Sequence, residues 1–452
     1  MRFFSSSCRT LIPTYKVAVV GSGPSAFYTA YHVLSKKPET FNVTVDFFEK
    51  LPTPFGLSRY GVAPDHPEVK NCEDYLRTMM KDSPVRFFGN VTVGKDITLG
   101  ELEQSYHSIC LAYGVDNDNS LDIPGSDSPQ VIPARQFVNW YNGYPTDFKP
   151  PNLEGIEDVT IIGNGNVALD VARVLLAPID HWKPTDISED ALEVLRGSTV
   201  KNVNIVARRG LLESAFTTKE IRELLDLSKK GIKFIPIEES LWEDFVPSIN
   251  KLDRPNKRKF TTIQKHLNQQ IEHPQKTWSL QYMKSPKEFV TENGKLAKTI
   301  FTKNELVEGK VVAQDEQIEV KNELVILSIG YRGSSIAGME RYFLDRESRL
   351  QNKGGRVKPG YYTSGWIKNG PKGIIASTMM DSFDTGFNML EDLNNGEYLQ
   401  GEKADITEKL PNAVTWDQWL KLDDFELKQG EAKGKSRDKV NNIEKMLEIV
   451  NS

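Results

Sequence analysis

Two glycine-rich turns in this chain are placed to bind phosphate groups. The first, GSGPSA at residues 21–26, follows the apolar run Val17–Val20, and the second, GNGNVA at residues 163–168, follows Val159–Ile162. The first glycine of such a turn permits a sharp bend, and the second lets the backbone approach a pyrophosphate. Each turn opens a segment with helical apolar spacing, whose amino terminus offers free N–H groups. The sequence therefore predicts two dinucleotide-binding sites.

The residues at the ends of the strands that follow distinguish the two sites. Glu49 ends the strand after the first turn, 28 residues beyond Gly21, where a carboxylate can accept hydrogen bonds from ribose hydroxyls. The corresponding strand of the second module ends on Arg208 and Arg209. An acidic residue there would repel a 2′-phosphate, whereas guanidinium groups match a phosphate in charge and geometry. We therefore predict FAD at the first site and NADPH at the second.

The three cysteines show no pattern that could hold a redox-active metal or disulfide, so any electron transfer would need an organic cofactor. Cys8, Cys72 and Cys110 form no CxxC pair, which excludes a zinc ribbon, a Cys-ligated iron–sulfur cluster and a closely spaced redox disulfide. No metal site is predicted. A flavin can accept a hydride from nicotinamide and release electrons singly, so it can carry out one-electron transfer without a metal centre.

Length and composition describe the scaffold that must position these groups. A chain of 452 residues is too long for one ordinary core and favours two domains. The hydrophobic content of 38% and charged content of 26% are typical of a soluble globular protein. The net charge of −5 argues against a nucleic-acid binder, and no apolar run approaches the ~20 residues of a membrane-spanning helix.

The amino terminus has the composition of a mitochondrial transit peptide. It contains Arg2, Arg9 and Lys16 among several hydroxyl residues, and the first acidic residue is Glu39. We expect residues 1–14 to be a leader that directs the protein to the mitochondrial matrix. An untargeted tail is the alternative.

Several longer stretches resemble the NADPH:adrenodoxin (ferredoxin) reductase family, the mitochondrial flavoenzymes that reduce a 2Fe–2S ferredoxin. The similarity covers nearly everything after the leader, and its segments occur in the family's order. They are KLPTPFGLSRYGVAPDHPEVKN, GNGNVALDVARVLL, ARRGLLESAFTTKEIREL, SGWIKNGPKGIIASTMMDSFDTG, WDQWLKLD and GKSRDK.

The resemblance implies an α/β fold with two Rossmann-like nucleotide-binding domains of the glutathione-reductase type. The NADPH-binding domain, expected at residues 116–331, would be inserted into a discontinuous FAD-binding domain at residues 15–115 and 332–452. The two crossings between the domains would lie near Ala112 and Gly330, where apolar strands end in glycine.

The resemblance also implies the cofactor contacts. Ser25 and Asn164 depart from the alanine and glutamine usual at those places, but the contacts there run largely through the backbone. The FAD contacts, with the glycines of the first turn, are Gly21, Gly23, Ser25, Glu49, Leu57, Val93, Trp366, Gly373, Ile374 and Ile375. The NADPH contacts are Asn164, Gly165, Asn166, Val167, Arg208, Arg209, Glu220 and Gly373.

Two further pairs of residues follow from the same resemblance. His66 and Asp170 occupy positions that the family places near the flavin, as a polar link between cofactor and docking surface. Arg254 and Arg258 match docking arginines, and their spacing would place both on one helix face. An acidic ferredoxin would need such a positive patch, because the chain as a whole is negative.

The leading hypothesis is an enzyme that passes a hydride from NADPH to FAD and single electrons to a mitochondrial 2Fe–2S ferredoxin. Such electrons would support iron–sulfur cluster, haem or steroid-type biosynthesis, and the enzyme could rest on the matrix face of the inner membrane. One alternative is a glutamate-synthase-like electron-transfer subunit, which normally carries cysteine-ligated clusters. Another is a redox sensor that binds both nucleotides without turnover.

Overall fold

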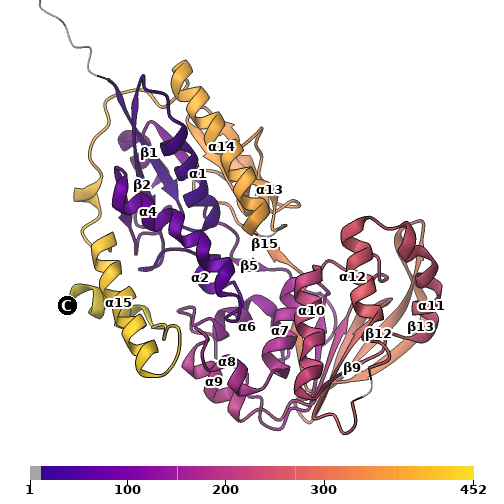
Figure 1. Ribbon diagram of the computed structural model, residues 1–452. Helices are drawn as coiled ribbons and strands as arrows, with labels where there is room; N and C mark the ends of the chain where they lie inside the picture. The colour runs from indigo at the N-terminus through magenta and orange to yellow at the C-terminus, as the bar shows by residue number, and fades with distance from the viewer. Residues whose placement is uncertain (1–11, 150, 270, 374) are drawn as a thin grey trace, which may run out of the picture.

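The computed structural model describes residues 12–149, 151–269, 271–373 and 375–452. The chain forms two α/β lobes, each built on a six-stranded sheet (Figure 1). Most of the expected leader and Ile374 lie outside the described residues. Thr14, the last residue of the expected leader, already belongs to the first strand.

The first sheet combines strands from both ends of the chain. Its order is β18-β19-β4-β1-β2-β3, and every neighbouring pair is parallel except β18 with β19. Val17–Val20 pairs with β2 on one side and β4 on the other, so this run is buried in the middle of the sheet, as its continuous apolar sequence predicts. The strands are β1 (Thr14–Val20), β2 (Asn42–Phe48), β3 (Val85–Phe88), β4 (Ser108–Leu111), β18 (Arg356–Lys358) and β19 (Tyr361–Thr363).

Helices cover this sheet, and two that pack together come from opposite ends of the sequence. α1 (Pro24–Lys36) packs along α14 (Ile375–Asn395), and the absence of a side chain at Gly386 leaves room for the carbonyl of Thr29 and the side chain of His32. The smaller helices are α2 (Leu57–Tyr60), α3 (Pro67–Lys70), α4 (Asp74–Asp82), α5 (Leu99–Ser105) and α13 (Trp366–Asn369).

The second sheet lies wholly within the middle of the chain and is entirely parallel. Its order is β6-β14-β7-β8-β10-β9. The strands are β6 (Val131–Pro133), β7 (Asp158–Ile162), β8 (Asn202–Val206), β9 (Ile232–Ile235), β10 (Lys276–Gln281) and β14 (Leu324–Leu327). The helices are α6 (Ala134–Tyr141), α7 (Asn166–Leu176), α8 (Ile179–Trp182), α9 (Glu189–Arg196), α10 (Thr218–Asp226), α11 (Glu239–Phe245) and α12 (Arg254–Gln264).

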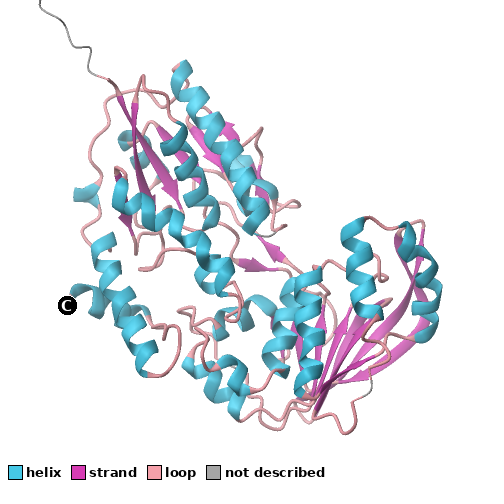
Figure 2. Ribbon diagram, viewed as in Figure 1, coloured by secondary structure: helices cyan, strands magenta, loops and turns pink. Residues whose placement is uncertain are grey.

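An antiparallel three-stranded sheet extends this second lobe. Its long strands are β11 (Lys284–Glu292), β12 (Lys295–Val307) and β13 (Lys310–Lys321), seen in magenta in Figure 2. Phe289, Leu296 and Phe301 pack against Val206 and Val325 of the parallel sheet. This sheet is therefore attached to the lobe through a core of its own.

The chain passes between the lobes at two places that lie side by side. β5 (Asn117–Asp118) pairs antiparallel with β15 (Tyr331–Arg332), and Figure 1 shows both between the lobes. The second lobe is thus inserted into the first, and the first is discontinuous in sequence. The residue boundaries given above remain a prediction.

The chain ends on the first lobe. A small hairpin of β16 (Phe343–Leu344) and β17 (Arg349–Leu350) follows the second crossing. α15 (Trp416–Ala432), which begins with a capping box at Thr415 and Gln418, and α16 (Ile443–Asn451) add Trp419 and Met446 to the first core. Among the described residues, no helix has the length and apolar character needed to span a membrane.

Candidate functional site: two nucleotide cradles and the polar network between them

The first glycine turn has the shape of a phosphate cradle. Gly21 has φ +101°, and a Cβ atom there would stand 2.5 Å from the carbonyl oxygen of Ala112, so only glycine fits. Gly23 caps α1 without any side-chain hydrogen bond, and a Cβ atom there would meet nothing nearer than 3.9 Å. The amino terminus of α1 is therefore open to a pyrophosphate, which its N–H groups and dipole would stabilise.

Glu49 is held against this turn. The backbone N–H and the hydroxyl of Ser22 donate to Glu49 Oε2 at 3.1 and 2.7 Å, and the N–H of Leu51 donates to Oε1 at 3.2 Å. Burial raises the pKa of Glu49, although these hydrogen bonds oppose the shift. Each carboxylate oxygen has two lone pairs, so the group retains acceptor capacity for ribose hydroxyls.

The second turn repeats this geometry in the inserted lobe. Gly163 has φ +119°, and a Cβ atom there would stand 2.0 Å from the carbonyl oxygen of Ser328. Gly165 caps α7 with no side-chain hydrogen bond, and a Cβ atom there would meet no described atom within 4 Å. Asn166 Oδ1 accepts a hydrogen bond of 2.8 Å from the N–H of Thr217, which fixes the loop before α10 next to the turn. Asn164 and Val167 are half-buried beside it.

Arg208 and Arg209 follow the end of β8 and are exposed. Neither guanidinium forms an ion pair with a carboxylate of the described residues. Their backbone is fixed by the antiparallel sheet, because Asn304 Nδ2 donates to the carbonyl of Arg208 at 2.8 Å and the N–H of Met283 donates to that of Arg209 at 3.2 Å. Two unneutralised positive charges thus stand on a fixed loop beyond the second turn.

His66 and Asp170 come from different lobes and meet through an arginine. Arg173, on α7, lies 2.9 Å from Asp170 Oδ1 and 3.3 Å from His66 Nε2, and it donates two hydrogen bonds to Asp65. Its side chain is only 1% exposed. His66 Nε2 also lies 2.6 Å from Glu223 Oε2 on α10.

The charges in this network shift one another's ionisation. Burial lowers the pKa of His66, but the hydrogen bond to Glu223 and the nearby aspartates outweigh it, so the net pKa is raised. Burial raises the pKa of Asp170, against the opposing charges of Arg173 and His66. The network therefore keeps a titratable histidine between carboxylates at the boundary of the lobes.

Sequence reasoning named His66 and Asp170 but missed Arg173 and Glu223. Arg173 sits on the buried side of α7, where an arginine three residues after an aspartate is the only local sign of a buried pair. Glu223 is 157 residues from His66 and gave no sequence signal. Within the described ranges, no group of three or more His, Cys, Asp or Glu side chains is placed to hold a metal ion.

Comparison with known proteins decides the family. No family model matches the chain. The mitochondrial NADPH:adrenodoxin oxidoreductase of Drosophila melanogaster is 39% identical over 97% of this chain and 94% of its own, and the human one is 38% identical over 97% and 92%. The NADPH-ferredoxin reductase FprA of Mycobacterium tuberculosis is 37% identical over 96% and 99%.

The chain belongs to the NADPH:adrenodoxin oxidoreductase family. The fold agrees, because the structure of Mycobacterium tuberculosis FprA in complex with NADPH superposes with a TM-score of 0.90 at 36% identity, covering 97% of this chain and 100% of that one.

In this member of the adrenodoxin oxidoreductase family, Trp366 lies close to the first turn. Its ring stacks on that of Tyr331 in the second crossing, with centroids 5.4 Å apart and planes at 23°. A Cβ atom on the preceding Gly365 would stand 2.4 Å from Ser25 Oγ, so the backbone before Trp366 touches the start of α1. The structure thus brings together three parts of the chain that sequence reasoning connected only by resemblance.

The other predicted contact residues of this oxidoreductase are more scattered. Leu57 is 41% exposed at the start of α2, whereas Val93 is buried. Gly373 is exposed with φ +89°, and Ile375 begins α14. Glu220, on α10, has a buried Oε2 atom with no hydrogen-bond partner among the described residues, and burial raises its pKa.

The predicted docking arginines lie on a helix. Arg254 and Arg258 are both exposed on α12, one turn apart. Lys259, from the same basic run LDRPNKRKF at residues 252–260, points inward instead. It is 7% exposed and donates to the carbonyl of Ser214 at 2.7 Å. Only part of this basic run can therefore face a partner.

Proposed function

We propose that the protein takes electrons from NADPH and delivers them singly to a 2Fe–2S ferredoxin in mitochondria. It is an NADPH-dependent oxidoreductase of the adrenodoxin oxidoreductase type, and FAD and NADPH are its cofactors. When bound, FAD supplies the exchange between hydride and single-electron transfer. The protein's own task is to bind both nucleotides, orient them and exclude water.

The first turn is the FAD site in this proposal. Gly21 and Gly23 would let the pyrophosphate approach, and Glu49 would accept the ribose hydroxyls. Ser25 and Trp366 lie on elements that touch beside the turn, so they would border the same ligand. Leu57, Val93, Gly373 and Ile375 are assigned to this site by resemblance alone.

The second turn is the NADPH site. This assignment is carried by one observation: Arg208 and Arg209 are exposed behind an intact glycine turn and form no ion pair with any described carboxylate. A 2′-phosphate would supply the anion that the protein does not. Asn164, Gly165, Asn166 and Val167 would line the pyrophosphate, and the unpartnered Oε2 of Glu220 is an acceptor for a ligand donor.

His66 and Asp170 are proposed to act between the two sites. They stand where the lobes meet, and Arg173 and Glu223 restrict their positions. This arrangement suits a role in holding the nicotinamide and flavin sites in register. The raised pKa of His66 also favours the protonated imidazole at this boundary.

The electron acceptor is proposed to be an acidic ferredoxin that docks at Arg254 and Arg258. The chain carries a net charge of −5, so a local positive patch is needed to orient an acidic partner. The mitochondrial matrix is the proposed compartment, where the electrons would support iron–sulfur cluster, haem or steroid-type biosynthesis. Association with the inner membrane would be peripheral.

Anaerobic titration of the yellow purified protein tests this function. NADPH should bleach the flavin absorbance within the dead time of manual mixing, and NADH at equal concentration should do so far more slowly. Retained absorbance after addition of excess NADPH would contradict the proposal and favour the redox-sensor alternative.

A further inference from the structure

The segment between α15 and α16 leaves the first lobe and returns to it. The flanking helices belong to that lobe, because Trp419, Leu422, Met446 and Val450 are buried in its core. The intervening residues 433–441, here called the C-terminal strap, run instead along the inserted lobe. A strap with both ends fixed to one lobe can restrain the other.

The strap makes a series of polar contacts with one short stretch of the inserted lobe. Lys435 Nζ donates to the carbonyl of Ile187 at 2.7 Å, and the N–H of Ser436 donates to the carbonyl of Pro184 at 2.9 Å. Asn441 Nδ2 donates to Asp190 Oδ2 at 2.7 Å. The stretch therefore receives both backbone and side-chain donors from the strap.

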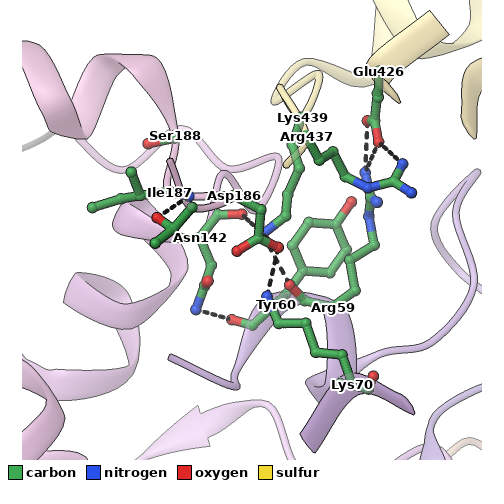
Figure 3. A network of polar contacts seen from close by, with 12 residues as sticks. Arg59, Tyr60, Lys70, Asn142, Asp186, Ile187, Ser188, Glu426, Arg437 and Lys439 are labelled. Atoms are coloured by element: carbon green, nitrogen blue, oxygen red, sulfur yellow. Dashed lines mark hydrogen bonds and ion pairs between the residues drawn. The ribbon is translucent and has the colours of Figure 1, made fainter. Parts of the chain in front are cut away.

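Lys439 is the central contact of the strap. Its side chain is fully buried, and its Nζ lies 2.9 Å from Asp186 Oδ2 of the inserted lobe. The same Nζ donates to the carbonyl of Asn142 at 3.1 Å and to that of Arg59, in the first lobe, at 3.2 Å (Figure 3). One ammonium group thus uses its hydrogen-bond donors on both lobes at once.

Asp186 is held from a second direction by the first lobe. Lys70, at the end of α3, donates to Asp186 Oδ2 at 2.5 Å, so two lysines of the first lobe converge on one carboxylate of the second. Burial would raise the pKa of Asp186, but these two positive charges lower it below its usual value. The carboxylate therefore remains ionised in the neutral range, whereas burial lowers the pKa of Lys439 itself to about 7.

The strap itself has little freedom to move. Glu426, fully buried on α15, accepts from both Arg59 and Arg437, at 2.6–2.9 Å, and from the N–H of Val440 at 2.9 Å. A Cβ atom on Gly430 would stand 2.6 Å from the Cα atom of Arg437, so the strap lies directly on α15. The position of Lys439 is fixed by this support rather than by its own contacts alone.

We propose that Lys439 is a positioning residue for electron transfer. Its contacts with Asp186 set the orientation of the inserted NADPH lobe relative to the FAD lobe, and so determine where the two nucleotides meet. This inference rests on the proposed function, because only transfer between two bound nucleotides requires such alignment. Reactions between oriented groups lose rate steeply when their separation changes by ~1 Å.

The test compares Lys439→Met with wild-type holoenzyme. Methionine keeps the length and apolar stem of lysine but cannot bridge the lobes. At saturating NADPH, the first-order rate of flavin bleaching should fall roughly ten- to a hundred-fold, while the NADPH concentration for half-saturation changes little. Small-angle scattering should show a larger radius of gyration, and hydrogen exchange should accelerate at residues 184–190.

Two further variants separate positioning from general destabilisation. Lys435→Met removes a second strap contact and should reproduce the direction of both effects, whereas Lys428→Met, which alters an exposed pair within α15, should change neither. A folded Lys439→Met protein with lower thermal stability but unchanged bleaching rate and scattering would overturn the proposal. If NADPH failed to bleach the flavin of the wild-type protein, the proposed function would be wrong. The scattering data would then test the strap separately: an unchanged radius of gyration in Lys439→Met would overturn its role in holding the lobes, and a larger radius would support it.

Discussion

Arg173 of the inserted lobe donates two parallel hydrogen bonds to Asp65 of the first lobe, from Nε to Oδ2 at 2.7 Å and from Nη2 to Oδ1 at 2.8 Å. Although burial opposes them, His181 and Arg173 together hold the pKa of Asp65 below its usual value, so the carboxylate stays ionised. This bidentate pair fastens the loop that carries His66 to the helix that carries Asp170.

Removal of this arginine should destabilise the protein strongly. Arg173→Leu would remove the buried positive partner of Asp170 and the bidentate partner of Asp65, which typically costs about 3–5 kcal/mol. Denaturant unfolding monitored by flavin release would measure the loss. Arg196→Leu is the control, because the ion pair of Arg196 with Glu189 is exposed. A loss no larger than that of the control would contradict the network's structural importance.

The paired arginines of the second site should determine nucleotide preference. Replacing Arg208 and Arg209 by serine would remove charge-assisted hydrogen bonds to a 2′-phosphate, worth about 1.5–3 kcal/mol each. The KM for NADPH should rise by roughly a hundred-fold or more, and the KM for NADH should stay nearly constant. Arg341→Ser, at another exposed arginine, should alter neither. Equal losses with both nucleotides would show that the pair does not bind the 2′-phosphate.

Charge reversal on α12 should weaken partner binding alone. Arg254→Glu with Arg258→Glu should raise the KM for ferredoxin severalfold and reduce its dependence on salt, because exposed charges act mainly on encounter and orientation. Flavin bleaching by NADPH should be unchanged, since both side chains project from the surface. The comparison variant is Lys295→Glu, at the exposed start of β12. An equal effect there would indicate a response to net charge only.

His66 should make stability depend on pH in a defined direction. Burial lowers the pKa of His66, but the hydrogen bond to Glu223 outweighs burial, so the net pKa is raised. The folded protein therefore binds the imidazole proton more tightly than the unfolded chain does. The stabilisation is fully present below the unfolded pKa of about 6.5 and is lost as the pH rises through the folded pKa. Urea denaturation of wild type and His66→Gln should therefore differ most below the unfolded pKa of about 6.5, and the difference should shrink as the pH rises above the raised folded pKa. A difference that grows with pH would contradict this ionisation.

The parts of the site that could be predicted are those encoded by short stretches of sequence. The glycine turns, Glu49 and the Arg208–Arg209 pair each follow a strand within a few residues, so local pattern and strand length suffice to place them. The docking prediction requires a helix over Arg254 and Arg258, and α12 satisfies that condition.

The remaining features depend on contacts between distant residues. Arg173 and Asp65 are 108 residues apart, and Lys439 reaches Asn142 across 297. No local sequence pattern indicates such pairs, because the partners come together only when both lobes have folded. Burial of single residues is also hard to predict, because Arg258 is exposed whereas its neighbour Lys259 is buried. One further residue along the helix turns the side chain by about 100°, which directs it into the core.

The proposed transfer of electrons to a ferredoxin is tested most directly by reduction of cytochrome c by NADPH in the presence and absence of a mitochondrial 2Fe–2S ferredoxin. Cytochrome c serves as a terminal acceptor that accepts one electron at a time. The protein alone should reduce cytochrome c slowly, and the rate should rise with ferredoxin concentration until it saturates. A rate that is the same with and without ferredoxin would contradict the proposed transfer.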